Sequence, residues 1–316
     1  MVKTFLPAPQ GSVRLFQAGG ITVFLHWSWF IVAIYEFSNP GDRYSSRVWN
    51  VVEYLALFAI VLMHEFGHAL ACRQVGGKAE QIVLWPLGGV AYVNPPQRPG
   101  PTLWSIVAGP LVNLVLLAIF TPIWMLARAY GWWDGTSNFG NWFRSMYFIN
   151  VSLLVFNLLP IYPLDGGQIL RSLLWFVLGR GKSLAVSAVI GLLGVVLLFV
   201  LAVFAESVWF GILAVFILMN CWRGLQAAMM IVKLERLPRH PGFACPNCHA
   251  APPMGVVCVC PACRTKFDTF ATLATCPKCA AQFAQTQCLH CGAASPISAW
   301  VEFLTDKKNG DSPCHA

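Results

Sequence analysis

The sequence predicts an α-helical polytopic membrane protein with about six transmembrane helices, a re-entrant β-hairpin and a small C-terminal zinc-ribbon domain. Hydrophobic residues make up 57% of the 316 residues and only 11% are charged, whereas a typical soluble domain has about 25% charged residues. Several segments stay apolar over the roughly 20 residues that a helix needs to cross a bilayer. C-x-x-C pairs recur after residue 240, a spacing typical of zinc sites or disulfides.

Six apolar segments are predicted to cross the membrane: residues 21–37, 51–72, 102–126, 142–159, 183–204 and 208–230. Only three residues separate the last two segments, so these should form an antiparallel helical hairpin. Residues 1–20 are predicted to be a polar lead-in without a cleavable signal peptide, because prolines and glycines interrupt them. His26 is interpreted as an interfacial residue, with a gate near a metal as the alternative.

Residues 73–100 are too rich in glycine and proline for a span. Within them, Gln81 to Val93 holds two β-prone runs, IVLW and VAYV, on either side of Pro86 to Gly89. This pattern predicts a hairpin or re-entrant loop. Such backbone is tolerated at membrane depth only against protein or a wet cavity, so we expect it to line a site, where its free edge could pair with a substrate strand. An ordinary surface hairpin is the alternative.

Basic residues in the short loops predict the orientation. Six spans place both termini on one side, together with the larger set of basic residues: Lys3, Arg14, Arg73, Lys78, Arg98, Arg171, Arg180, Lys182, Lys233, Arg236 and Arg239. Both termini are therefore predicted to be cytosolic, in a bacterial or archaeal inner membrane. The net charge of +8 fits loops beside a membrane and does not indicate a nucleic-acid surface. The predicted domains are a membrane domain (21–230), a basic linker (231–242), a zinc-ribbon domain (243–300) and a tail (301–316).

The sequence HEFGH lies inside the second predicted span. His64 and His68 are four residues apart, so on a helix they share one face and could hold one metal ion. Glu65 lies about 100° away and could act as a base towards water at the metal. A chance pentapeptide is the alternative, but a charged cluster at mid-membrane is costly without a function.

Zinc held by two histidines needs another protein ligand. Asp165 follows a proline-broken helix end and precedes Gly166 and Gly167, and the predicted topology places it on the same side as HEFGH. It is therefore a candidate third ligand. The alternative is that Asp165 caps the helix that begins near Gly167.

HEFGH, Gly109-Pro110-x-x-Asn113 and NLLPIYPLDG occur in this order, and Gly88 and Gly89 lie in the re-entrant piece between the first two motifs. This arrangement resembles the site-2 protease family of intramembrane zinc metalloproteases over about residues 21–230. Its N-x-x-P-x-x-x-L-D-G motif is matched here by Asn157, Pro160, Leu164, Asp165 and Gly166.

The resemblance implies cleavage of membrane protein substrates. It implies that His64, His68 and Asp165 bind zinc and that Glu65 is the catalytic base. It also implies that Asn113 and Asn157 orient water or the scissile carbonyl, although a membrane asparagine can equally join helices. The last two predicted spans and the tail lie outside the family core.

The predicted zinc-ribbon domain contains C-x-x-C pairs that predict two structural zinc sites: Cys245, Cys248, Cys260, Cys263, Cys276, Cys279, Cys288 and Cys291. A cytosolic location favours zinc over disulfides. We expect sequential pairing, the first two pairs sharing one ion and the last two the other; crossed pairing, or Cys258 in place of Cys260, is the alternative. So small a domain should need its metal to fold. It could dock a cytosolic partner or regulator, whereas nucleic acid is disfavoured because basic residues are sparse.

The predicted function is intramembrane proteolysis with one catalytic and two structural zinc ions. The alternative is a catalytically silent binding, chaperone or metal-handling protein of the same fold, which would not need Glu65. A zinc transporter would need further acidic residues or histidines in several spans, and the spans lack them. The oligomeric state is not predicted.

Overall fold

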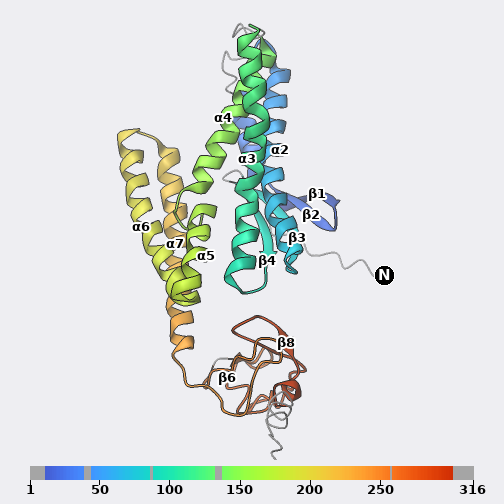
Figure 1. Ribbon diagram of the computed structural model, residues 1–316, viewed down its shortest axis with the longest axis vertical. Helices are drawn as coiled ribbons and strands as arrows, with labels where there is room; N and C mark the ends of the chain where they lie inside the picture. Colours follow the sequence, from blue (N-terminus) through green and yellow to red (C-terminus); the bar gives the residue numbers. More distant parts are fainter. Residues whose placement is uncertain (1–10, 39–43, 86–87, 132–136, 257, 302–316) are drawn as a thin grey trace, which may run out of the picture.

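The computed structural model describes residues 11–38, 44–85, 88–131, 137–256 and 258–301. Long helices and one small sheet form the larger part, and a cysteine-rich domain follows the end of the last helix (Figure 1). The helices are α1 (Ser28–Ser38), α2 (Arg47–Gln74), α3 (Pro99–Ala129), α4 (Asn138–Leu158), α5 (Asp165–Leu178), α6 (Arg180–Phe204) and α7 (Val208–Glu235).

Four helices among the described residues are long and apolar enough to cross a membrane. They are α2, α3, α6 and, from Phe210, α7. They contain four of the six segments that the sequence predicts as spans. The predicted span 142–159 lies in α4, which has 21 residues and is not among the four. The expected antiparallel hairpin of α6 and α7 is present (Figure 1), and large apolar side chains such as Leu193 and Phe216 are exposed on it.

The prediction of one helical span over residues 21–37 is wrong. This segment divides into strand β2 (Ile21–His26) and the short helix α1. The β-branched residues Ile21, Thr22 and Val23 open β2, and Ile21 and Val23 are fully buried. Burial between two other strands stabilises this part as a strand. The 11 residues of α1 are too few to cross a bilayer.

A four-stranded sheet has the order β1-β2-β3-β4, with β1 at Ser12–Ala18, β3 at Lys78–Trp85 and β4 at Gly88–Asn94. The lead-in 1–20 thus contributes a strand. The hairpin expected over Gln81 to Val93 is confirmed, because β3 and β4 pair antiparallel, while β2 pairs parallel with β3. Strand β4 is an outer strand of this sheet, so one of its sides is not used in the sheet.

Arg73, in the last turn of α2, joins this helix to the sheet. Its Nε donates to the Ala79 carbonyl over 2.8 Å, and its Nη2 donates to the Gly20 carbonyl over 3.0 Å. Its Nη1 also donates to the Gly19 carbonyl. In addition to these hydrogen bonds of Arg73, Ile82 and Leu84 of β3 share a hydrophobic core with Val61 and Ala69 of α2. The sheet is therefore fixed against the helix that carries HEFGH.

The loop before α5 rests on the α6–α7 hairpin. Cys221 of α7 donates its thiol to the Tyr162 carbonyl over 2.8 Å. Gly191 of α6 and Gly224 of α7 lie so close to Tyr162 that an added Cβ would approach it within 3.0 and 2.9 Å. Small residues on both helices thus let the hairpin support the chain just before Asp165.

The cysteine-rich domain contains two two-stranded sheets, β5–β6 and β7–β8 (Cys258–Val259, Lys266–Phe267, Thr286–Gln287 and Ala294–Ser295). Its small apolar core includes Trp300 and Phe270. The Asp268 carboxylate accepts from His240 over 2.8 Å and from the backbone N–H groups of Gly255 and Phe270. Burial raises the pKa of Asp268, but these hydrogen bonds outweigh it and hold that pKa below its usual value. The linker thereby joins the domain.

Candidate metal centre and active site

Helix α2 presents His64 and His68 on one face, one turn apart, as their spacing predicts. Both side chains are buried, and their Nε2 atoms lie 3.1 Å from each other. The two rings are nearly perpendicular, with an interplanar angle of 83°. Two ring nitrogens therefore converge on one point beside the helix.

Asp165 is the first residue of α5, and it reaches the same point from a segment about a hundred residues later in the chain. Its Oδ2 lies 3.1 Å from Nε2 of His64 and 3.3 Å from Nε2 of His68. The alternative interpretation of Asp165 as the helix N-cap is wrong, because Leu164 occupies that position. The tertiary structure thus brings together the three groups expected to bind a metal.

Hydrogen bonds to the other ring nitrogens fix the chemistry of this cluster. Nδ1 of His68 lies 2.9 Å from the Ser105 carbonyl oxygen, which only accepts, so Nδ1 carries the proton. Nδ1 of His64 lies 2.5 Å from Oδ1 of Asn113 and donates likewise. In the neutral rings both Nε2 atoms are then acceptors, and they face a carboxylate oxygen that is buried without a hydrogen-bond donor among the described residues.

Three acceptors that converge in this way fit a bound cation. A tetrahedral zinc ion with bonds of about 2.0–2.1 Å has ligand atoms about 3.3–3.4 Å apart, close to the three observed separations. The set of two histidines and one carboxylate leaves a fourth position open, as in catalytic zinc sites. The residues present therefore suit zinc.

Asn150 of α4 completes the hydrogen-bonded chain behind His64, and sequence reasoning missed it. Asn113 Nδ2 donates to Asn150 Oδ1, and Asn150 Nδ2 donates to the Asn113 backbone carbonyl, both over 2.9 Å. Both side chains are 0% exposed. Since a carbonyl can only accept, the pair fixes the orientation of the Asn113 amide and hence the proton on Nδ1 of His64. The sequence did offer one signal for Asn150, namely that it is a polar residue inside a predicted span that is otherwise mostly apolar.

Glu65 points from α2 to the sheet. Its Oε2 accepts a hydrogen bond from the backbone N–H of Ala91 in β4 over 2.9 Å. The close approach of β4 requires Gly89, because a Cβ there would lie 2.2–2.5 Å from the Glu65 carboxylate group. A Cβ on Gly109 of α3 would similarly lie 2.2 Å from Nε2 of His68. The two glycines thus make room for the site's side chains.

Two sequence-derived candidates stand apart from this cluster. Asn157 lies in the last turn of α4, half-buried, and no hydrogen bond recorded among the described residues joins it to the three converging groups. His26 stacks on Trp85 with ring centroids 3.7 Å apart and lies 2.5 Å from the Ser28 hydroxyl. Its recorded contacts are with the sheet and α1, and none is with the metal cluster.

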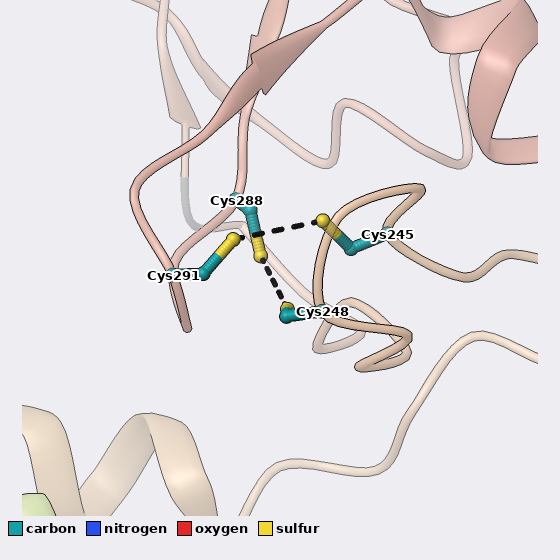
Figure 2. A group of neighbouring side chains, drawn as sticks. All are labelled: Cys245, Cys248, Cys288 and Cys291. Carbon is teal, nitrogen blue, oxygen red and sulfur yellow. Dashed lines mark hydrogen bonds between the residues drawn. The ribbon is translucent and has the colours of Figure 1, made fainter. Parts of the chain in front are cut away.

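The cysteines form two groups that could each hold a metal. The outer group consists of Cys245, Cys248, Cys288 and Cys291, and the inner group of Cys260, Cys263, Cys276 and Cys279. The sulfur atoms of the outer group face one another (Figure 2), with 3.7 Å both between Cys245 and Cys291 and between Cys248 and Cys288. The corresponding inner distances are 3.6 Å.

These distances fit zinc, because a tetrahedral site with Zn–S bonds of about 2.3 Å separates its sulfurs by about 3.8 Å, whereas a disulfide has about 2.05 Å. The expected sequential pairing is wrong. The first pair meets the last, and the two middle pairs meet each other, because the chain folds the inner group as an insertion and returns to the start. Cys258 is in β5 opposite Phe267, so Cys260 keeps its place in the inner group.

Known proteins resemble the membrane portion. Residues 52–133 and 134–201 match the model of Peptidase family M50. Over this part, just under half of its length, the chain is similar to peptidase family M50. The two matched stretches contain His64, Glu65, His68 and Asp165, whereas the cysteine-rich domain lies outside them.

Individual curated proteins are also similar to this part of the chain. Zinc metalloprotease MJ0392 of Methanocaldococcus jannaschii is 34% identical over 182 residues, covering 57% of this chain and 50% of that protein. Stage IV sporulation protein FB of Bacillus subtilis is 37% identical over 118 residues, covering 37% and 38%. The chain spans about half the length, or less, of these curated relatives.

A solved structure of the site-2 protease from Methanocaldococcus jannaschii is also similar. It is 27% identical, with a TM-score of 0.51, and the match covers 68% of this chain and 95% of that one. The M50 fold therefore extends over most of the helical part.

Proposed function

We propose that this protein is an intramembrane zinc metalloprotease that hydrolyses peptide bonds within or near the membrane spans of other proteins. The observation that carries this proposal is the convergence of two imidazoles and a carboxylate, from two distant helices, beside Glu65 and an outer β-strand. A binding protein needs neither a buried carboxylate next to the metal ligands nor a strand edge that leads to it.

In this proposal His64, His68 and Asp165 hold the catalytic zinc ion. When bound, zinc supplies Lewis-acid chemistry, which makes water more acidic and polarises a peptide carbonyl. Asn113 keeps the lone pair of His64 Nε2 directed at the ion. Glu65 takes the proton of the attacking water and passes it to the leaving amine. The Ala91 N–H orients the Glu65 carboxylate for this task.

Strand β4 is proposed to hold the substrate. The Ala91 N–H points out of the sheet toward Glu65. In an antiparallel pair the outward-facing backbone groups alternate, so those of Gly89 face the same way. An unwound substrate segment can add to this edge as a further strand, which brings its peptide bonds to the site. A helical segment cannot, because its own backbone groups are already paired.

The rest of the chain fits the same proposal. We propose three zinc ions per chain, one catalytic and two bound by the outer and inner cysteine groups. Both termini are proposed to be cytosolic, on the side with the larger set of basic residues. The cysteine-rich domain follows the end of α7, and Arg180, the first residue of α6, donates to the Leu289 carbonyl over 3.4 Å. The domain would there meet a cytosolic partner or regulator. Asn157 remains a proposed positioning residue.

Glu65→Gln tests the proposal. Co-expression with a single-span reporter protein whose span contains helix-breaking residues should show cleavage by the wild type. Loss of a general base lowers rates by about 10²–10⁴-fold, so the variant should give no detectable product while still holding three zinc ions by elemental analysis. Glu80→Gln, on the exposed side of β3, is the matched control and should cleave normally. Cleavage by Glu65→Gln at the wild-type rate would refute the assignment.

A further inference from the structure

Helix α7 carries a charged residue on its outer surface at a depth where the membrane is expected. Arg223 lies near the middle of the candidate span Phe210–Glu235 and is exposed. Asn220 and Gln226 are three residues to either side; Gln226 is exposed and Asn220 is half-buried, and the three side chains lie on one face of the helix. The side chains around them are apolar, such as Met219 and Met230. A polar stripe thus crosses an otherwise lipid-compatible surface.

The stripe faces away from the rest of the protein. The buried face of α7 is formed by Ala214, Ile217, Cys221 and Ala228. Arg223 is two residues, or about 200°, beyond Cys221 around the helix. Because Cys221 bonds to the Tyr162 carbonyl, Arg223 lies at the depth of the loop that leads to Asp165, on the opposite side of α7.

The described residues offer Arg223 no counter-ion, since no ion pair or hydrogen bond of its side chain is recorded among them. Glu235 and Glu206 are 12 and 17 positions away along the chain, about 18 and 26 Å on a helix. Glu65 and Asp165 belong to the metal centre. Arginine within a span is costly and normally pairs inside a protein interface. Asn220 donates to the Phe216 carbonyl over 2.8 Å, so the stripe is only partly satisfied by its own helix.

We propose that the face of α7 formed by Asn220, Arg223 and Gln226 binds a membrane span of a second protein that carries an aspartate or glutamate at the depth of the metal centre. The guanidinium presents several donors, which suit a carboxylate, and the two amides add hydrogen bonds between helices. The bound span is not the one being cut, because this face is turned away from the Tyr162 loop and β4. The partner is therefore an accessory membrane protein that contacts the helix supporting the Asp165 loop.

The full-length protein in vesicles of zwitterionic lipid provides the test. The probes are leucine-rich single-span peptides that differ only by an aspartate or a leucine in the cytosolic half, and binding is measured by energy transfer. We expect the aspartate peptide to bind at least tenfold more tightly than the leucine peptide. Arg223→Met should abolish this preference, whereas Arg236→Met, at the end of the same helix, should retain it. Arg223→Glu with a lysine peptide should restore it.

The outcomes separate the partner from its alternatives. Equal binding of both peptides, or a preference that survives Arg223→Met, would overturn the inference. Binding of an added anionic phospholipid that depends on Arg223, without any preference between the peptides, would also overturn it. That result would identify a lipid headgroup as the occupant. Retention of three zinc ions by Arg223→Met excludes misfolding as the cause. The inference depends on α7 being a membrane span and is independent of cleavage, so its failure leaves the proposed protease activity untouched.

Discussion

Replacing Asn150 by alanine should weaken zinc binding at a histidine that Asn150 does not contact. The change leaves an Asn113 side-chain N–H without a partner in a fully buried position, at a cost of about 1–3 kcal/mol. It also removes the side-chain donor to the Asn113 backbone carbonyl. The amide of Asn113 can then rotate and present its NH₂ to Nδ1 of His64. That orientation favours the tautomer with the proton on Nε2, where the metal is expected.

The magnitude follows from this indirect role. Loss of a hydrogen-bond partner behind a metal-ligating histidine typically costs 10–100-fold in metal affinity, which is about 1.4–2.8 kcal/mol. The full-length protein is titrated with a zinc chelator and its zinc content is measured by elemental analysis. In Asn150→Ala, one of the three zinc ions should be lost at a correspondingly lower chelator concentration than in the wild type. Ser152→Ala, on the exposed face of the same helix, should leave the titration unchanged.

A double-mutant comparison distinguishes positioning from general destabilisation. Asn113→Ala removes the acceptor of His64 directly. If Asn150 acts through Asn113, adding Asn150→Ala to Asn113→Ala should not shift the zinc midpoint further. Additive shifts, or a midpoint within twofold of the wild type for Asn150→Ala alone, would refute the reasoning.

The remaining predictions concern space and pairing. Gly109→Ala should displace the imidazoles and lose the membrane zinc and all cleavage, whereas Gly100→Ala in the same helix, with nothing near its Cβ position, should keep both; equal zinc content in the two variants would contradict this. Serine at both Cys245 and Cys288 should cost one zinc ion in elemental analysis, because both belong to the outer group. Serine at both Cys245 and Cys260 should cost two, and the reverse result would restore the sequential pairing.

Local patterns were enough to find the candidate site. His64 and His68 are four residues apart on a helix, so their meeting is a property of the helix itself. The hairpin of β3 and β4 is similarly local, and its turn and β-prone runs predict it. Asp165 was identified through its glycine-flanked break and the family motif. Its approach to the two histidines, however, depends on the packing of α5 against α3 and of α3 against α2.

Other features could not be predicted because several folds satisfy the same local pattern. The apolar run from Ile21 to Phe37 fits a buried strand as well as a helix, and only the place between β1 and β3 decides in favour of a strand. The role of Asn150 could not be predicted either, because a single amide in an apolar segment does not indicate which residue it hydrogen-bonds.

The sequence by itself predicted the chemistry proposed for this protein: the candidate metal ligands, the proposed base and the apolar segments that place them in a membrane. These depend on residue identity and on spacings within one helix turn or one knuckle. Only the tertiary structure decided which cysteine pairs share a zinc ion, which amide orients His64 and which strand edge reaches Glu65. Those are contacts between residues far apart in the chain, and the free energy of packing the whole fold selects among them.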